Sequence, residues 1–208
     1  MSLHAHHITA GHHPGDPVLT DVTLTIPAGT TIGLTGPSGS GKTTLARVLA
    51  GLHTPHRGHV TLDDQPLSTA ERGAVAMLFQ SPRQAVTGRW TLGRIIAEPL
   101  RDGRGRAGTI GVTAARVGLT DDLLDRRPHQ VSDGQLQRAC LARALVQQPR
   151  YLICDEMTAM LDPATTAALT TVITEETRRG LGVLTISHHH TLLDAWADHT
   201  IQHDAAAP

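Results

Sequence analysis

The sequence predicts an α/β fold whose central sheet is mostly parallel and covered by helices on both faces. Short apolar segments at residues 31–35, 151–154 and 182–186 are separated by helical patterns. Strands that are apolar at consecutive positions are typical of parallel sheets buried on both faces. The N-terminal part differs, because residues 22–26 alternate apolar and polar side chains, as a half-exposed antiparallel strand does.

The composition indicates one domain of balanced charge. A chain of 208 residues can bury a substantial core, and we treat residues 1–208 as a single domain. The formal net charge of −1 argues against nucleic acid or anionic lipid as a partner recruited by a basic field. Apolar runs fall short of the roughly 20 residues of a membrane-spanning helix, and no apolar secretory signal opens the chain. We expect a cytosolic protein that reaches a membrane only through partners.

Cysteine and histidine usage gives two further expectations. Cys140 and Cys154 fall in a predicted helix and a predicted buried strand, so we expect core thiols rather than a disulfide. Metal binding by the fourteen histidines is the less favoured interpretation. Alternate residues of a strand face opposite sides, and only Asp16 lies near the first cluster as a further ligand. The clusters are His4, His6, His7, His12 and His13; His53, His56 and His59; and His188, His189 and His190.

A phosphate-binding loop follows the first predicted buried strand. Residues 36–44 (GPSGSGKTT) fit the pattern G-x-x-x-x-G-K-[ST], and apolar positions spaced i, i+3, i+4 and i+7 over residues 45–52 predict a helix after it. A strand, a glycine turn and a helix in this order aim backbone N–H groups at one point, which suits a polyphosphate. The order disfavours the alternative of a glycine-rich turn with an incidental lysine. We expect Lys42 to reach the β- and γ-phosphates and the Thr43 hydroxyl to hold Mg²⁺. The predicted nucleotide-binding residues are Gly36, Pro37, Ser38, Gly39, Ser40, Gly41, Lys42, Thr43 and Thr44.

The remaining elements follow from turn and cap signals. Ser132 and Gln135 match a capping box that begins a helix ending before Pro149, and Asp162 caps a second helix that Gly180 ends. Residues 81–130 contain short helical patterns interrupted by Gly, Arg and Pro. We interpret them, with the helix that follows, as an inserted helical subdomain over about 81–148. Further strands are predicted at 3–9, 18–26, 59–62, 74–79 and 200–202.

Polar residues follow the apolar strands, and ligands of such sheets bind beyond the carboxyl ends of the strands. Asp155 and Glu156 end the strand 151–154, so we expect Asp155 to bind Mg²⁺ and Glu156 to polarise the attacking water. Gln80 could orient that water and touch Mg²⁺, and His188 could bond to the γ-phosphate. The alternative interpretations are a charged turn for the two acids and a polar strand end for Gln80.

The order and spacing of these motifs resemble those of ATP-binding-cassette (ABC) ATPase subunits over nearly the whole chain. The discriminating motif is VSDGQ at residues 131–135. The resemblance implies a P-loop NTPase of the ABC ATPase fold, with an antiparallel β subdomain, an inserted helical subdomain, and hydrolysis of ATP with Mg²⁺. It also implies a head-to-tail dimer in which Ser132 and Gly134 of one copy close on the γ-phosphate held by Lys42 of the other. The trans residues that it implies are Ser132, Asp133, Gly134 and Gln135, with Asp162 in an interface loop.

A narrower resemblance is to the oligopeptide, dipeptide and nickel importer ATPases. It depends on FQSP at residues 79–82, IIAEPL at 95–100 and RPHQ at 127–130. It implies import of a small solute, a peptide or a nickel or other metal chelate, through transmembrane permease subunits. The chain would be peripheral, at the cytoplasmic face of the plasma (inner) membrane. Its partners would be ATP, a second ABC ATPase subunit and a permease helix docked near Gln80, with no nucleic acid.

Two departures from the family pattern bear on the site. The VSDGQ motif is called the signature below. Asp133 replaces its usual first glycine, and the carboxylate should slow closure of the dimer on the γ-phosphate unless it points away. His12 stands where an aromatic residue usually stacks on adenine, and imidazole offers less stacking area. Two other functions stay open: a nucleotide-gated ABC binding module with little hydrolysis, and a non-transport ABC ATPase of DNA repair or translation. The second is disfavoured, because no long coiled coil separates the loop from the signature and only one cassette is present.

Overall fold

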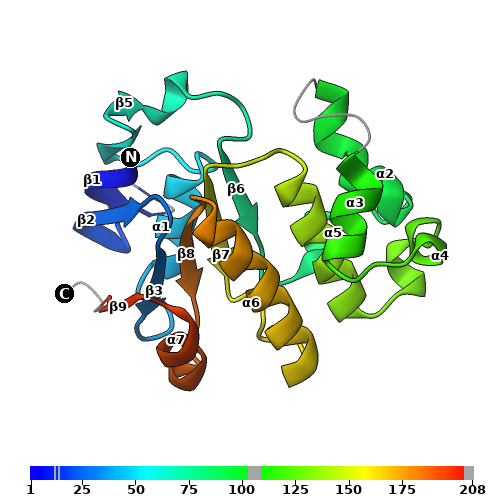
Figure 1. The fold of residues 1–208 in the computed structure, drawn as a ribbon. Helices are drawn as coiled ribbons and strands as arrows, with labels where there is room; N and C mark the ends of the chain where they lie inside the picture. Colours follow the sequence, from blue (N-terminus) through cyan, green and yellow to red (C-terminus); the bar gives the residue numbers. More distant parts are fainter. Residues whose placement is uncertain (12, 14, 103–108, 204–208) are drawn as a thin grey trace.

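A five-stranded parallel sheet forms the centre of the molecule (Figure 1). The computed structural model describes residues 1–11, 13, 15–102 and 109–203. The α/β prediction is confirmed, since all four neighbouring strand pairs run parallel. The three inner strands are buried at every position, which explains their run of mostly apolar residues. In spatial order the strands are β6 (Val75–Leu78), β7 (Tyr151–Asp155), β8 (Gly182–Ile186), β3 (Thr31–Thr35) and β9 (His199–Gln202).

A second, antiparallel sheet is built mainly from the N-terminal part of the chain. Its inner face packs on the first helix, and Leu3, Ala5 and Ile8 share one buried cluster with Leu45. The alternation of buried and exposed residues along its strands follows from this one-sided packing. The strand order is β2 (Leu19–Pro27), β1 (Ser2–Ala10), β4 (Arg57–Leu62) and β5 (Gln65–Pro66).

Three histidines stack on one face of the antiparallel sheet. The ring centroids of His4 and His6 are 3.7 Å apart, and those of His6 and His59 are 4.6 Å apart. Strand alternation therefore does not separate these three rings, because they occupy alternate positions of β1 and a paired position of β4. Within the described part of the chain, no group of three or more His, Cys, Asp or Glu side chains could hold a metal ion.

Three helices lie against the parallel sheet: α1 (Lys42–Leu49), α6 (Pro163–Arg178) and α7 (His190–Trp196). The apolar face predicted for the first of them is wrong at its last residue. The helix ends at Leu49, Gly51 takes a φ of 70°, and Leu52 is turned outward with 59% of its surface exposed. Among the residues that the structure describes, no helix combines the length and apolar character needed to cross a bilayer.

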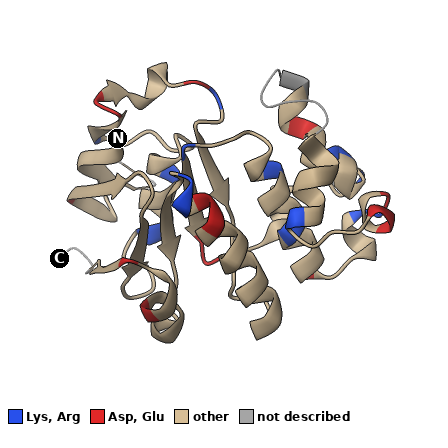
Figure 2. Cartoon of the chain, viewed as in Figure 1, with Lys and Arg blue, Asp and Glu red and all other residues tan. Residues whose placement is uncertain are grey.

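The segment between β6 and β7 is mainly helical and lies to one side of the parallel sheet (Figure 1). We call this segment the helical lobe and the rest of the chain the sheet lobe. The longest helix of the helical lobe, α5, packs against both lobes, since Leu136 and Leu141 belong to the same buried cluster as Ile96 and Leu152. Basic and acidic residues are intermixed over the elements in view (Figure 2). The helices are α2 (Leu92–Ala97), α3 (Thr109–Arg116), α4 (Asp121–Leu124) and α5 (Asp133–Leu145), with 3₁₀ turns η2 (Pro82–Ala85), η3 (Glu98–Asp102) and η4 (Pro128–Gln130). A further 3₁₀ turn, η1 (Leu67–Thr69), lies outside this segment, between β5 and β6.

The two cysteines are free and buried, as the sequence predicts. Burial raises the pKa of the Cys140 thiol to about 11 and also raises that of Cys154, because the thiolate would lose its hydration.

At pH 8 the native thiolate fraction of Cys140 should therefore be about a hundredfold below that of an ordinary cysteine. We expect both thiols to react far more slowly with an aromatic disulfide reagent in the native protein than in protein unfolded by urea. The absorbance of the released aromatic thiolate measures the rate. Equal rates in the two states would contradict this core.

Candidate functional site

The phosphate loop connects β3, the fourth strand across the sheet, to the start of α1. Its glycines are required by conformation and by space. Gly41 caps the helix at a φ of 92°, and a Cβ there would lie 2.6 Å from Cδ2 of Leu19. A Cβ on Gly36 would lie 2.1 Å from the carbonyl oxygen of His203. The loop is thereby fixed ahead of the helix N-terminus, where the first N–H groups of a helix have no partner within it, and this arrangement suits an anion.

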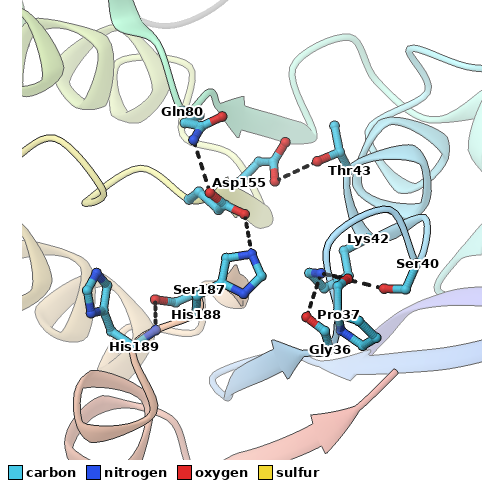
Figure 3. Close-up of polar contacts among 11 residues, drawn as sticks. Gly36, Pro37, Ser40, Lys42, Thr43, Gln80, Asp155, Ser187, His188 and His189 are labelled. Carbon is cyan, nitrogen blue, oxygen red and sulfur yellow. Dashed lines mark hydrogen bonds and ion pairs between the residues drawn. The ribbon is translucent and has the colours of Figure 1, made fainter. Parts of the chain in front are cut away.

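Lys42 lies beneath this loop with only 5% of its surface exposed. Its ammonium donates to the carbonyl oxygens of Gly36 at 2.9 Å and Pro37 at 2.7 Å (Figure 3). Burial lowers the pKa of Lys42, and the carboxylates of Glu156 and Asp155 oppose that shift. The charge is thus held at the mouth of the loop, where phosphate oxygens could replace the two carbonyl acceptors.

Thr43 and Asp155 bring oxygen ligands to the same place. The Thr43 hydroxyl donates to Oδ1 of Asp155 at 3.2 Å (Figure 3). Asp155 ends β7 and is 4% exposed, and this desolvation raises its pKa while the bond from Thr43 acts against the rise. The amide nitrogen of Gln80 donates to Glu156, so the side-chain carbonyl oxygen of Gln80 is the third candidate metal ligand. A hydroxyl, a carboxylate and an amide oxygen fit Mg²⁺, which prefers oxygen ligands.

The carboxylate of Glu156 is bonded to residues that follow two other strands. Its Oε1 pairs with Nε2 of His188 at 3.0 Å, and its Oε2 accepts from the amide nitrogen of Gln80 at 3.0 Å (Figure 3). The backbone of Glu156 has a φ of 47°, an uncommon conformation for a residue with a side chain. The ends of β6, β7 and β8 thus meet on one carboxylate. The structure brings together the four segments predicted to converge after strands, those of Lys42, Gln80, Asp155 with Glu156, and His188.

The VSDGQ segment forms the N-terminus of α5 as a reciprocal capping box. The Ser132 hydroxyl accepts from the N–H of Gln135 at 3.2 Å, and the Gln135 side chain accepts from the N–H of Ser132 at 3.0 Å. A Cβ on Gly134 would lie 3.1 Å from the Cγ2 atom of Thr165 in α6. In Figure 1, β6 and β7 lie between α1 and α5, so the phosphate loop and the capped helix occupy different lobes.

Asp162 caps α6, as predicted. Its carboxylate accepts from the N–H of Thr165 at 2.9 Å and from the hydroxyl of the same residue at 2.6 Å. These hydrogen bonds lower the pKa of Asp162. The predicted role of His12 lies outside the described residues.

Two residues near the site escaped the sequence reasoning. Arg83, in η2, pairs through Nε with Oδ1 of Asp133 at 2.7 Å, so the signature carboxylate has a cationic partner. His203 bonds through Nε2 to the carbonyl oxygen of Ser40 at 2.7 Å and supports the phosphate loop from the end of β9. Each contact joins segments 50 or more positions apart. No local sequence pattern predicts such pairs. The charge of Arg83, three residues after Gln80, indicates only that an anionic partner is needed and does not identify it.

Comparison with known proteins gives concordant matches. The family model described as ABC transporter matches residues 19–159. The chain is 40% identical over 204 residues to the nickel import ATP-binding protein NikE of Rhodospirillum rubrum, covering 92% of this chain and 74% of that protein. It is 35% identical over 214 residues to the protein of the same name from Escherichia coli (strain K12), covering 97% and 80%. A solved structure of an ATP binding subunit of an ABC transporter matches the fold with a TM-score of 0.86 at 22% identity, covering 100% of this chain and 89% of that one.

Replacing Ser132 tests the capping box. Ser132→Ala removes the acceptor for the Gln135 N–H and should lower the free energy of unfolding by about 1 kcal/mol. Ser132→Thr retains a hydroxyl and should stay within about 0.5 kcal/mol of the wild type. Urea unfolding followed by circular dichroism measures both values. An alanine variant as stable as the threonine variant would contradict the cap.

Proposed function

This chain belongs to the ABC transporter family as an ATPase subunit, and we propose that it dimerises on ATP to drive solute import through partner membrane subunits. The observation that carries this proposal is the separation of two half-sites. One lobe holds the buried Lys42 and Glu156, whose carboxylate is bonded to His188 and Gln80, and the other presents the capped helix end at Ser132. Each half is incomplete alone, so a second ATPase subunit, identical or related, would complete both.

Nucleotide binding is proposed for the phosphate loop, residues 36–44. Lys42 would exchange its carbonyl acceptors for β- and γ-phosphate oxygens, and the N–H groups at the start of α1 would bind the same phosphates. Thr43, Asp155 and Gln80 would hold Mg²⁺, which neutralises phosphate charge when bound. The raised pKa of Asp155 is consistent with a carboxylate awaiting a cationic partner.

Hydrolysis is proposed for Glu156 as the group that polarises the attacking water. Its two carboxylate oxygens are bonded to His188 and Gln80, so these two side chains orient the carboxylate at the strand ends. In the closed dimer His188 would turn to the γ-phosphate and Gln80 would help to orient the water. Ser132 and Gly134 of the second subunit would supply N–H donors to the γ-phosphate, with Asp162 in the interface loop.

The membrane partner is proposed to dock in a groove between the two lobes. A cavity of about 370 Å³ lies there, and the exposed Leu52 stands at its edge. A groove lined by both apolar and charged side chains, beside the strand that leads to Gln80, suits a short amphipathic helix. The chain would then be peripheral, at the cytoplasmic face of the plasma (inner) membrane. Its solute would be nickel, which the names of the NikE relatives favour, or else another metal chelate or a peptide. The groove is lined by Ala50, Leu52, Val75, Ala76, Met77, Phe79, Glu98, Pro99, Cys140, Arg143, Ala144 and Gln147.

A nucleotide-gated module with little hydrolysis is the alternative, because Asp133 brings negative charge to the signature. The ion pair with Arg83 weakens that objection. Single-turnover hydrolysis by the purified wild type and by Glu156→Gln separates the two functions. The ATPase proposal expects the variant to be about a hundredfold to ten-thousandfold slower, the range for loss of a positioned base, with nucleotide still bound. A wild type as slow as the variant would leave only the gated module.

Leu52 tests the docking groove. Leu52→Glu places a charge at the edge of the groove and should weaken binding to the permease subunits by about tenfold, because a docked partner would desolvate an unpaired carboxylate. Val112→Glu is the matched control, because Val112 is also exposed (66%) and lies on α3, outside the groove. Co-purification with a co-expressed permease measures both. Retention of the complex by Leu52→Glu would place the partner elsewhere.

A further inference from the structure

Arg83 joins the segment after Gln80 to the start of the signature helix through all of its guanidinium nitrogens. Nη1 donates to the carbonyl oxygen of Pro128 at 2.8 Å, and Nη2 donates to that of Val131 at 3.2 Å. Nε pairs with Oδ1 of Asp133 at 2.7 Å. The two hydrogen bonds to backbone carbonyls hold the planar guanidinium in position, so its charge is fixed beside the carboxylate.

Two more side chains of α5 hold the same segment. The amide nitrogen of Gln137 donates to the carbonyl oxygen of Phe79 at 3.4 Å. Nη1 of Arg143 donates to that of Ala85 at 2.8 Å. Residues 79–85, which include Gln80, therefore lie along the signature helix and are bonded to it at both ends and in the middle. The backbone that carries Arg83 is therefore held beside the start of α5.

The charge of Asp133 needs this partner for a reason that comes from its position. Asp133 is the first residue of α5 and follows Ser132, where the proposed function places the γ-phosphate of the second subunit. A lone carboxylate there would repel the phosphate and occupy the positive end of the helix dipole. Both members of the pair are about half exposed, 46% and 45%, so the pair itself adds little to folding stability. The pair should instead act when the dimer closes, because the negative γ-phosphate then approaches it.

We propose that Arg83 is a positioning residue for ATP-dependent closure, which holds Asp133 in an ion pair so that the signature end can receive the γ-phosphate. The inference rests on the proposed dimer. Without Arg83, the uncompensated carboxylate should oppose closure. Without Asp133, no carboxylate repels the γ-phosphate at this position, so closure should proceed.

The experiment uses the Glu156→Gln background, which keeps ATP intact, and measures the ATP concentration at which half of the protein is dimeric. Adding Arg83→Met should raise that concentration by about tenfold, the size expected for one partly screened charge near a phosphate. Adding Asp133→Asn alone should lower it, because the Arg83 cation then lies near the γ-phosphate without its carboxylate partner. The combination of Arg83→Met with Asp133→Asn should recover most of the loss. Raising the salt concentration should shrink the Arg83→Met defect, because salt screens charges exposed to water.

Rescue and salt dependence separate this role from a structural one. Damage to the fold by Arg83→Met would persist in the double variant and would not respond to salt. If thermal unfolding shows that Arg83→Met is not folded, Arg83→Gln replaces it, since Gln keeps a donor and loses the charge. No defect in Arg83→Met, or a double variant as defective as the single one, would overturn the inference. Failure of the Glu156→Gln protein itself to dimerise on ATP would instead remove the proposed function.

Discussion

Burial of the Lys42 ammonium beneath a glycine loop is the constraint on which the rest of the site depends. A nearly enclosed cation needs acceptors, and the loop carbonyls of Gly36 and Pro37 supply them only because the loop turns tightly around it. The carboxylates of Asp155 and Glu156 lie close enough to oppose the fall in the pKa of Lys42. The parallel sheet matters because it brings these groups, from distant parts of the chain, to one edge.

Much of this could be predicted from the sequence because the relevant signals are local. The apolar runs of the inner strands follow from burial on both faces, and the capping box of Ser132 and Gln135 follows from four consecutive residues. The convergence of Gln80, Asp155, Glu156 and His188 followed from one rule, that polar residues after parallel strands share an edge. Their roles in catalysis and in metal binding remain predictions.

The rest depends on contacts between distant segments. Asp133 was expected to oppose the γ-phosphate, but its partner Arg83 lies 50 positions earlier and is brought to it only by the packing of η2 on α5. Leu52 continues a helical spacing that the chain abandons at Gly51, so periodicity alone could not show that it faces outward. The contact of His203 with the phosphate loop likewise depends on β9 pairing with β3. Charge and spacing signal that a residue needs a partner, but only the tertiary fold identifies the partner.

Complementation between two inactive variants tests most directly whether a site is completed by a second copy. Lys42→Ala removes the loop cation, and Ser132→Arg blocks the capped helix end, so each protein alone should lack ATPase activity. In a head-to-tail pair of the two, one site is wholly damaged and the other has both wild-type halves. The account predicts that mixing them restores hydrolysis to about a quarter of the wild-type rate, since half of randomly formed dimers would be mixed, with one intact site each. A mixture that stays inactive while each variant still folds would contradict it.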